Sequence, residues 1–206
     1  MLNKIINKIV KILINNGLYK IINLISFHYE VKRKSLLLDK FKNIGYGVVL
    51  PNTTNIINPQ YINIGNNFFA LGNLRIEAWD SYYEQIFSPE IIIGNDVILN
   101  TDIHIGCINR VVIGNNVLMA SRIYISDHSH GEITINALNL SPAKRPLVSK
   151  GPVIIEDNVW IGEGVSILPG VTIGRNSIIG TNSVVTKSFP ENSVIAGVPA
   201  KIIKKL

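Results

Sequence analysis

The feature that most constrains the fold is a six-residue repeat that begins at Ile155. Apolar residues of a helix return every three or four positions and those of a strand every two, so a sustained period of six matches neither element alone. It matches a coil of short strands, in which an inward Ile leads each strand and Gly, Asn or Pro shapes the corner. Five consecutive hexads keep this phase: Ile155–Trp160, Ile161–Ser166, Ile167–Thr172, Ile173–Ile178 and Ile179–Val184.

The same phase occurs earlier in the chain, at Ile93 and Ile113, with weaker copies at Ile44 and Ile64. In a parallel β-helix each hexad supplies one short strand and one corner, and three hexads complete a coil. The sequence therefore predicts an all-β solenoid, a parallel β-helix of hexapeptide repeats, over residues 44–187.

Two stretches break the period and are expected to be ejected from the coil. The first, residues 79–89, is rich in aromatic side chains, and the second, residues 126–152, contains several Gly and Pro residues. Long loops that leave a regular solenoid are usually functional or disordered. The second loop opens with two histidines, His128 and His130, and histidine is the side chain best suited to exchange a proton near neutral pH. We therefore expect the chemistry at this break.

The first 43 residues are predicted to form an amphipathic helical segment. Residues 1–42 hold nine Lys and Arg against two Asp and Glu, whereas the rest of the chain is close to neutral. Lysines interrupt each apolar run before the roughly 18 residues that span a bilayer. The segment also shows no signal-peptide cleavage pattern of small residues. The segment could cap the coil, pack on a neighbouring subunit, or rest on an anionic inner membrane surface. We expect a cytoplasmic protein, with peripheral membrane contact as one alternative, and no nucleic-acid partner.

Several motifs resemble the hexapeptide-repeat acetyltransferases, in particular their galactoside and maltose acetyltransferase branch. The matching segments are Ile113–His128, Asn158–Gly162, Leu168–Gly174, Val185–Lys187 and Ala196–Lys201. The run Arg75–Asp80 and the turn Asp127–Gly131 are closer still to bacterial O-acetyltransferases of capsule and lipopolysaccharide clusters. The resemblance extends from about residue 58 to the C-terminus.

This resemblance implies an enzyme that moves an acetyl group from acetyl-CoA to a sugar hydroxyl of a bacterial surface polysaccharide or its precursor. It implies a left-handed β-helix and a homotrimer with active sites between subunits. Acetyl-CoA is the expected co-substrate, and no metal is expected. Residues 188–206 would form a C-terminal tail that contacts the cofactor.

The resemblance places His128 at the position of the catalytic base. A hydroxyl is a poor nucleophile until a base removes its proton, and a positioned imidazole does this at neutral pH. We expect His130 to point away from His128 and to shape the acceptor pocket. Asp127 could orient the imidazole, but a role as a turn-forming residue is the simpler interpretation.

The resemblance also assigns residues to the acceptor. Asn100 matches the amide that positions the acceptor, with Asp102 as the nearest alternative. Trp160 is expected in the active site, as a wall for the acceptor or for the thioester end of the cofactor. A large aromatic ring at the edge of a solenoid is costly to expose to water, so it is expected to pack against a ligand or another group. Tyr82 and Tyr83, in the first ejected loop, offer aromatic faces to a sugar ring.

The cofactor is expected in a groove that offers backbone groups to the pantetheine amides and cations to the phosphates. Besides Trp160, the residues assigned to it by resemblance are Ala120, Glu163, Gly164 and Thr181 along the groove, and Thr186, Lys187, Lys201 and Lys204 at the nucleotide end.

Three alternatives stay open at this point. The nearest is an N-acetyltransferase that acts on an amino sugar or a nucleotide sugar. A zinc-dependent carbonic anhydrase of the same fold would need His104, His128 and His130 as ligands, with a spacing unlike that of those enzymes. A non-catalytic scaffold would leave the co-occurrence of His128, Trp160 and the C-terminal lysines without a reason.

Overall fold

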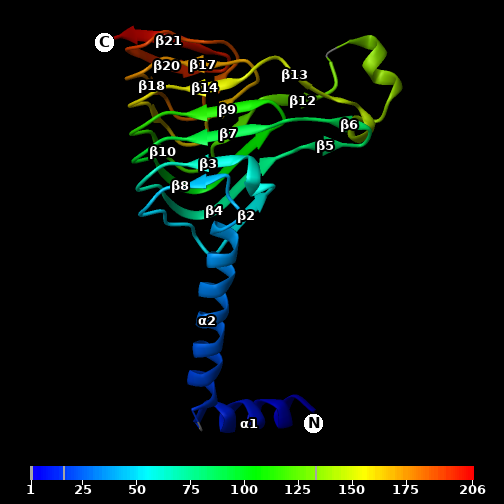
Figure 1. Ribbon diagram of the computed structural model, residues 1–206, viewed down its shortest axis with the longest axis vertical. Helices are drawn as coiled ribbons and strands as arrows, with labels where there is room; N and C mark the ends of the chain where they lie inside the picture. Colours follow the sequence, from blue (N-terminus) through cyan, green and yellow to red (C-terminus); the bar gives the residue numbers. More distant parts are fainter. Residues whose placement is uncertain (1, 16, 133) are drawn as a thin grey trace. The chain divides into compact units, whose positions relative to one another are not determined.

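The computed structural model describes residues 2–15, 17–132 and 134–206. The chain forms two compact units, Met1–Lys40 and Phe41–Leu206, the first helical and the second built of strands (Figure 1). The first unit ends three residues before the predicted boundary at residue 43, and the first strand, β1, begins at Asn43.

The N-terminal unit consists of α1 (Leu2–Asn15) and α2 (Leu18–Leu38). At 100° per residue, the apolar side chains of α1 fall mainly on one side of the helix and its three lysines on the other, which is the amphipathic pattern predicted from the sequence. Within the described residues, neither helix alone has the length and hydropathy of a membrane span; only the bent pair taken together reaches both.

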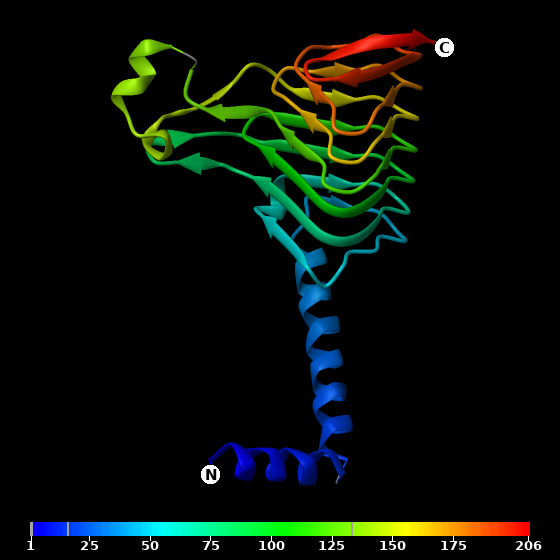
Figure 2. The same cartoon turned by 180° about the vertical axis from the view of Figure 1, so that it is seen from behind.

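The second unit stacks its strands in three columns, each of parallel strands in consecutive coils (Figure 2). The first column runs in the order β1 (Asn43–Ile44), β3 (Ile62–Ile64), β7 (Glu90–Ile93), β9 (Arg110–Ile113), β14 (Val153–Ile155) and β17 (Thr172–Ile173). The second column contains β10 (Leu118–Met119), β15 (Trp160–Ile161), β18 (Ile178–Ile179) and β20 (Ser193–Gly197), with β21 (Ala200–Lys205) antiparallel at its end.

The third column contains β2 (Thr54–Ile57), β4 (Phe69–Ala78), β8 (Ile98–Cys107), β11 (Tyr124–Ser126), β16 (Ser166–Ile167) and β19 (Val184–Val185). The long strands β4 and β8 bend around a corner, so their first residues belong to the second column and their last residues to the third. Residues 188–206, predicted as a tail, continue the stack through β20 and β21.

The core is the inside of the coils, filled by ladders of branched residues. In the first column Ile64, Ile93, Ile113, Ile155 and Ile173 lie directly above one another in register. All five are buried. Each layer therefore removes one large apolar side chain from water against its copies in the neighbouring coils, and the inward direction predicted for the leading Ile is confirmed.

The corners depend on residues that tolerate a left-handed backbone. Asn67, Asp96, Asn116, Asn158 and Asn176 occupy equivalent corners with φ of 55–58°. Asn and Asp adopt this conformation more readily than other non-glycine residues. Their side chains also bond between coils, as Asn67 Nδ2 does to Asp96 Oδ1 at 2.9 Å. Gly162 meets a different need, because a Cβ there would lie 2.8 Å from the Ile179 carbonyl oxygen in the next coil.

Both predicted breaks leave the coil at the corner that follows the third column (Figures 1 and 2). The first forms the hairpin β5 (Ser81–Tyr82) and β6 (Gln85–Ile86). The second contains β12 (His128–His130), β13 (Leu147–Ser149) and the short 3₁₀ helices Ile135–Asn139 and Pro142–Lys144, and another 3₁₀ turn spans Pro59–Tyr61 in the coil.

The two loops bind each other, and together we call them the loop arm (residues 79–89, 127–132 and 134–152). The side-chain amide of Gln85 donates to the Leu147 carbonyl at 3.1 Å and accepts from the Leu147 N–H at 2.7 Å. The hydroxyl of Tyr82 donates to the carbonyl of Ala143. Segments about sixty residues apart in the sequence therefore form one wall beside the coil.

Candidate active site

A cleft of about 1360 Å³ lies between the outward face of the third column and the loop arm. Its floor includes Arg75, His104 and Tyr124, which lie in register on β4, β8 and β11. Its wall includes Tyr82 and His130 of the loop arm. The cleft thus lies at the predicted break in the hexad period.

His128 is the first residue of β12, and its ring lines the cleft. The imidazole Nδ1 lies 2.9 Å from Oδ1 of Asp127. A carboxylate only accepts hydrogen bonds, so this pairing assigns the proton to Nδ1 and leaves the lone pair on Nε2. Among the described residues, no hydrogen-bond partner occupies Nε2. The ring can therefore accept a proton from a group bound in the cleft.

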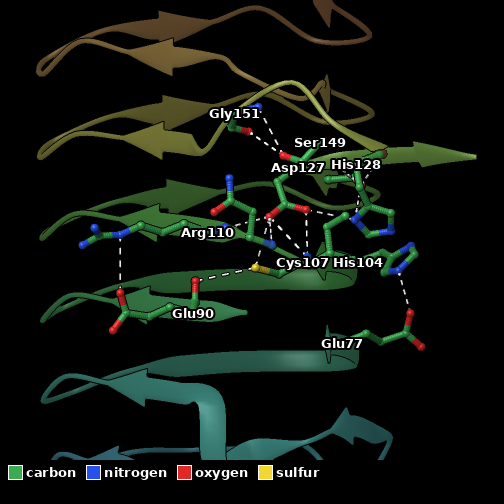
Figure 3. Close-up of polar contacts among 12 residues, drawn as sticks. Glu77, Glu90, His104, Cys107, Arg110, Asp127, His128, Ser149 and Gly151 are labelled. Carbon is green, nitrogen blue, oxygen red and sulfur yellow. Dashed lines mark hydrogen bonds and ion pairs between the residues drawn. The ribbon is translucent and has the colours of Figure 1, made fainter. Parts of the chain in front are cut away.

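Asp127 is fully buried, and its carboxylate is held by the backbone of the preceding coil (Figure 3). The N–H groups of Ile108, Asn109 and Arg110 donate to it at 2.9, 2.8 and 2.7 Å. A carboxylate fixed by three donors cannot turn away from the imidazole. The geometry supports an orienting role for Asp127, in place of the turn-forming role that the sequence favoured. Turn chemistry could not reveal donors that lie 17–19 residues earlier in the chain.

Cys107 is a buried structural residue, as its isolation in the sequence indicates. Its thiol donates to Oδ2 of Asp127 at 3.2 Å. Burial, followed by the charge of Asp127, raises the pKa of the thiol well above its usual range, so it stays protonated and adds one more donor to the carboxylate.

His130 lies on the same side of β12 as His128, and the expectation that it points away was wrong. Residues two apart in a strand share a face, and both rings line the cleft. Nδ1 of His130 is 3.4 Å from the hydroxyl of Tyr82, and the two rings meet edge to face. The contact with the predicted sugar-binding tyrosine keeps His130 in the wall of the cleft.

A second polar group in the cleft, formed by Arg75, Glu77 and His104, was missed by the sequence analysis. Glu77 is only 4% exposed, although it is on the outward face. Its Oε1 accepts from Arg75 Nε at 2.6 Å, and its Oε2 lies 3.3 Å from His104 Nε2. Burial, then the charge of Arg75, lowers the pKa of His104. The sequence carries only a weak signal for this pairing: Arg75 and His104 each precede an inward Ile, and the two segments are in register.

The other predicted site residues divide between two corners of the coil. Thr186 lines the cleft together with His128. Those at the corner between the second and third columns do not line this cleft; they are Asn100, Asp102, Ala120, Glu163, Gly164 and Thr181. Trp160 lies in the second column and is half-exposed.

The remaining predicted contacts lie outside the cleft. Lys187 is exposed, and Lys201 and Lys204 are exposed on β21 at the end of the stack. Tyr83 packs edge to face on Tyr82 and lines a separate, smaller cavity. Glu163, expected in the cofactor groove, forms an ion pair with Arg122 at 2.7 Å.

Among the described residues, the cleft histidines are not gathered with other metal-ligating side chains. Over residues 2–15, 17–132 and 134–206 no three His, Cys, Asp or Glu side chains are grouped as a metal site, and this includes the three cleft histidines. The buried carboxylates instead accept hydrogen bonds from protein groups.

Comparisons with known proteins show which family has this architecture. The family described as Bacterial transferase hexapeptide (six repeats) matches residues 152–187. WbbJ of Escherichia coli K12, which is named as a putative lipopolysaccharide biosynthesis O-acetyl transferase, is 42% identical over 154 residues, which cover 73% of this chain and 74% of WbbJ. A solved maltose O-acetyltransferase from Clostridium difficile 630 is 32% identical, with a TM-score of 0.50 over 85% of this chain and 75% of that one.

A variant of AntD, an N-acyltransferase from Bacillus cereus solved with dTDP-4-amino-4,6-dideoxyglucose and coenzyme A, shares the fold with a TM-score of 0.59, over 84% of this chain and 88% of that one. At 23% identity, this likeness concerns the fold alone. The identity to WbbJ over nearly three quarters of both chains goes further. Together with the hexads, it shows that the chain belongs to the hexapeptide-repeat acetyltransferases, an acyltransferase family whose acyl donor is acetyl-CoA.

Proposed function

We propose that this enzyme transfers the acetyl group of acetyl-CoA to a saccharide hydroxyl, with His128 as the general base. The observation that supports this most directly is the Asp127–His128 pair, which presents a free Nε2 to the cleft. As the hydroxyl oxygen attacks the thioester carbonyl, its proton passes to Nε2, and Asp127 stabilises the imidazolium. The carbon–sulfur bond then breaks, the acetyl group stays on the sugar oxygen, and the CoA sulfur leaves with the proton returned by His128.

The acceptor is a surface polysaccharide or its precursor. WbbJ and the maltose enzyme both carry names of O-acetyl transfer, at 42% and 32% identity. AntD, which is named as an N-acyltransferase, is similar in fold only. A hydroxyl acceptor is therefore favoured over an amine.

The coil has the left-handed winding of its family, and three copies of the chain complete the sites. The division of the predicted site residues supports this assembly. His128 and Thr186 lie in the cleft, whereas Asn100 and the groove residues lie at another corner of the same chain. A neighbouring copy that brought its Asn100 corner to this cleft would unite the two sets.

Acetyl-CoA then lies in a groove between two copies. Its pantetheine arm runs along Ala120, Gly164 and Thr181, with Trp160 near the thioester. Glu163 borders this groove while paired with Arg122. The exposed ammonium groups of Lys187, Lys201 and Lys204 face the phosphates at the nucleotide end.

The N-terminal unit holds the enzyme at the anionic inner surface of the membrane. Its helix α1 carries three lysines and no acidic residue. Ile5, Ile9 and Leu13 are spaced by one helical turn on the apolar side, and all three are exposed. A helix of this kind lies in the membrane interface, with its apolar side towards the acyl chains and its lysines among anionic headgroups. A lipid-linked acceptor would be available there.

Acetyl-CoA turnover against a panel of methyl glycosides and de-O-acetylated surface polysaccharides tests the reaction. We expect His128→Ala to lower turnover about 100- to 10,000-fold, the range for loss of a general base. His28→Ala is the matched control, because that imidazole lies on α2 and bonds to the Leu24 carbonyl. Turnover by His128→Ala at the level of the control would refute the mechanism.

Complementation tests the shared site. Asn100→Ala and His128→Ala chains, each inactive alone, are co-expressed with different tags and purified as mixed oligomers. A site built from two chains regains activity where His128 of one copy meets Asn100 of another. A site built within one chain stays inactive in every mixture.

Sedimentation with vesicles tests the membrane contact. The full chain should bind phosphatidylglycerol-containing vesicles and release them at high salt, with little affinity for pure phosphatidylcholine. Ile9→Asp should abolish binding, whereas Asn7→Asp, the same charge change on the polar side of α1, should weaken it only modestly. Equal loss in both variants would contradict insertion of the apolar side.

A further inference from the structure

The Arg75–Glu77–His104 group lies next to the reacting base. In the register of the third column, His104 is directly above Arg75, and Gly106 is directly above Glu77. The two imidazoles both approach Gly106, which has no side chain to separate them. A Cβ built there would lie 3.3 Å from His128 Cε1 and 3.8 Å from His104 Nε2. Both rings therefore border one point on the floor of the cleft (Figure 3).

His104 is held in a single orientation from two sides. Nε2 faces the Glu77 carboxylate at 3.3 Å, and the ring meets Tyr124 edge to face with centroids 5.3 Å apart. Glu77 is in turn fixed by the Arg75 guanidinium at 2.6 Å. With Nε2–H donated to Glu77, the lone pair of a neutral His104 is on Nδ1. Among the described residues Nδ1 of His104 has no hydrogen-bond partner, and His104 lines the cleft, so Nδ1 can accept a hydrogen bond from a bound hydroxyl.

We propose that His104 binds a second hydroxyl of the acceptor sugar, next to the one that His128 deprotonates, with Glu77 and Arg75 as positioning residues. This inference rests on the proposed function. The ligand class is a saccharide that presents two neighbouring hydroxyls to the two imidazoles. His128 takes the proton of one, and His104 fixes the sugar by the other.

A structural role alone would not explain this arrangement. Burying a carboxylate with a cation is weak support for stability, because desolvation offsets much of the attraction. Glu77 is on the outward face, where the inward ladders do not require a carboxylate, yet it is buried, and all three side chains line the cleft. An enclosed site that bonds substrate hydroxyls discriminates strongly against analogues that lack them.

Steady-state kinetics on the best glycoside of the panel tests the inference. We expect His104→Ala to raise the acceptor KM about tenfold or more, the effect of one lost hydrogen bond in an enclosed site. The KM for acetyl-CoA should stay within about twofold of wild type. Glu77→Gln should raise the acceptor KM less, because it weakens only the support of the ring. Ser166→Ala is the matched control, since Ser166 lies in the same outward row but does not line the cleft.

Deoxy analogues make the test specific. Removing the neighbouring hydroxyl from the glycoside should lower kcat/KM for the wild type and have little further effect in His104→Ala. If His104→Ala does not fold, His104→Phe serves instead, because it keeps a ring that can pack on Tyr124 and removes the nitrogen acceptor.

An equal deoxy penalty in wild type and His104→Ala, or an unchanged acceptor KM in an active enzyme, would overturn this inference alone. A fall of kcat in His104→Ala to the level of His128→Ala would also overturn it, since His104 would then act in proton transfer. A wild type that acetylates none of the glycans would overturn the proposed function, and this inference with it.

Discussion

Replacing Asp127 with Asn should keep the His128 imidazole in the cleft but change which of its nitrogens carries the proton. The carboxylate serves two sets of donors: Oδ2 accepts from Asn109 and Arg110, and Oδ1 accepts from Ile108 and from His128 Nδ1. The Asn amide would keep its oxygen towards the first pair, which turns its NH₂ group towards His128 Nδ1. That NH₂ group would stabilise the tautomer with the proton on Nε2, and the lone pair would no longer face the cleft.

The expected loss of kcat in Asp127→Asn follows from these contacts. Losing a hydrogen bond to a charged group costs about 1.5–3 kcal/mol, which is roughly 10- to 150-fold in rate. The wrong tautomer adds to this, and the same change in a serine protease triad lowers kcat by about 10,000-fold. We therefore expect Asp127→Asn to lower kcat at least about 100-fold. The Ile108 N–H, left facing an NH₂ group, should lower the free energy of unfolding by about 1–3 kcal/mol.

The assay is release of CoA thiol in the presence of a glycan acceptor, with the CoA dissociation constant and thermal unfolding measured on the same preparations. Cys107→Ala is the control, because this thiol contacts the same carboxylate without touching the imidazole. A folded Asp127→Asn enzyme that binds CoA and retains kcat within about threefold of the control would refute the reasoning, and Asp127 would then be a structural residue only.

Other predictions concern the coil and the loop arm. Gly162→Ala should lower the free energy of unfolding by about 1–3 kcal/mol, measured by urea unfolding, because its Cβ would meet backbone at 2.8 Å; Gly72→Ala, whose Cβ meets nothing nearer than 3.4 Å, should be much milder. The pKa of His104 is lower in the folded chain than in the unfolded chain, so the unfolded chain takes up a proton at this histidine first as the pH falls. The free energy of unfolding should therefore decrease as the pH drops through about 6.5. His104→Gln should therefore lose less Tm than wild type between neutral pH and pH about 5, and equal losses would contradict this. Gln85→Ala removes both bonds to Leu147 and should raise the acceptor KM without changing the KM for acetyl-CoA; an unchanged acceptor KM would show that the arm does not shape the site.

The sequence predicted the parts of the fold that follow from local repetition. The Ile residues that lead the hexads, from Ile155 onward, predicted which side chains point into the coil. The two breaks in the period predicted where the cleft lies. The cleft partners were harder to predict, because stacking depends on how many residues each loop removes from the coil. Glu77 and His104 meet across 27 residues, a separation that includes the whole first loop. His104 was therefore considered only as a zinc ligand.

The backbone of one coil fixes the carboxylate beside His128 in the next coil, so the proposed activity depends on how the coils stack during folding. The donors that fix Asp127 belong to Ile108–Arg110, in the coil that precedes the one ending in His128. In a solenoid each repeat is stabilised chiefly by its neighbours. Under the proposed mechanism, catalytic competence is then a property of a stacked pair of coils and of neither alone. A lesion that unstacks this pair would silence the enzyme while distant layers stay folded.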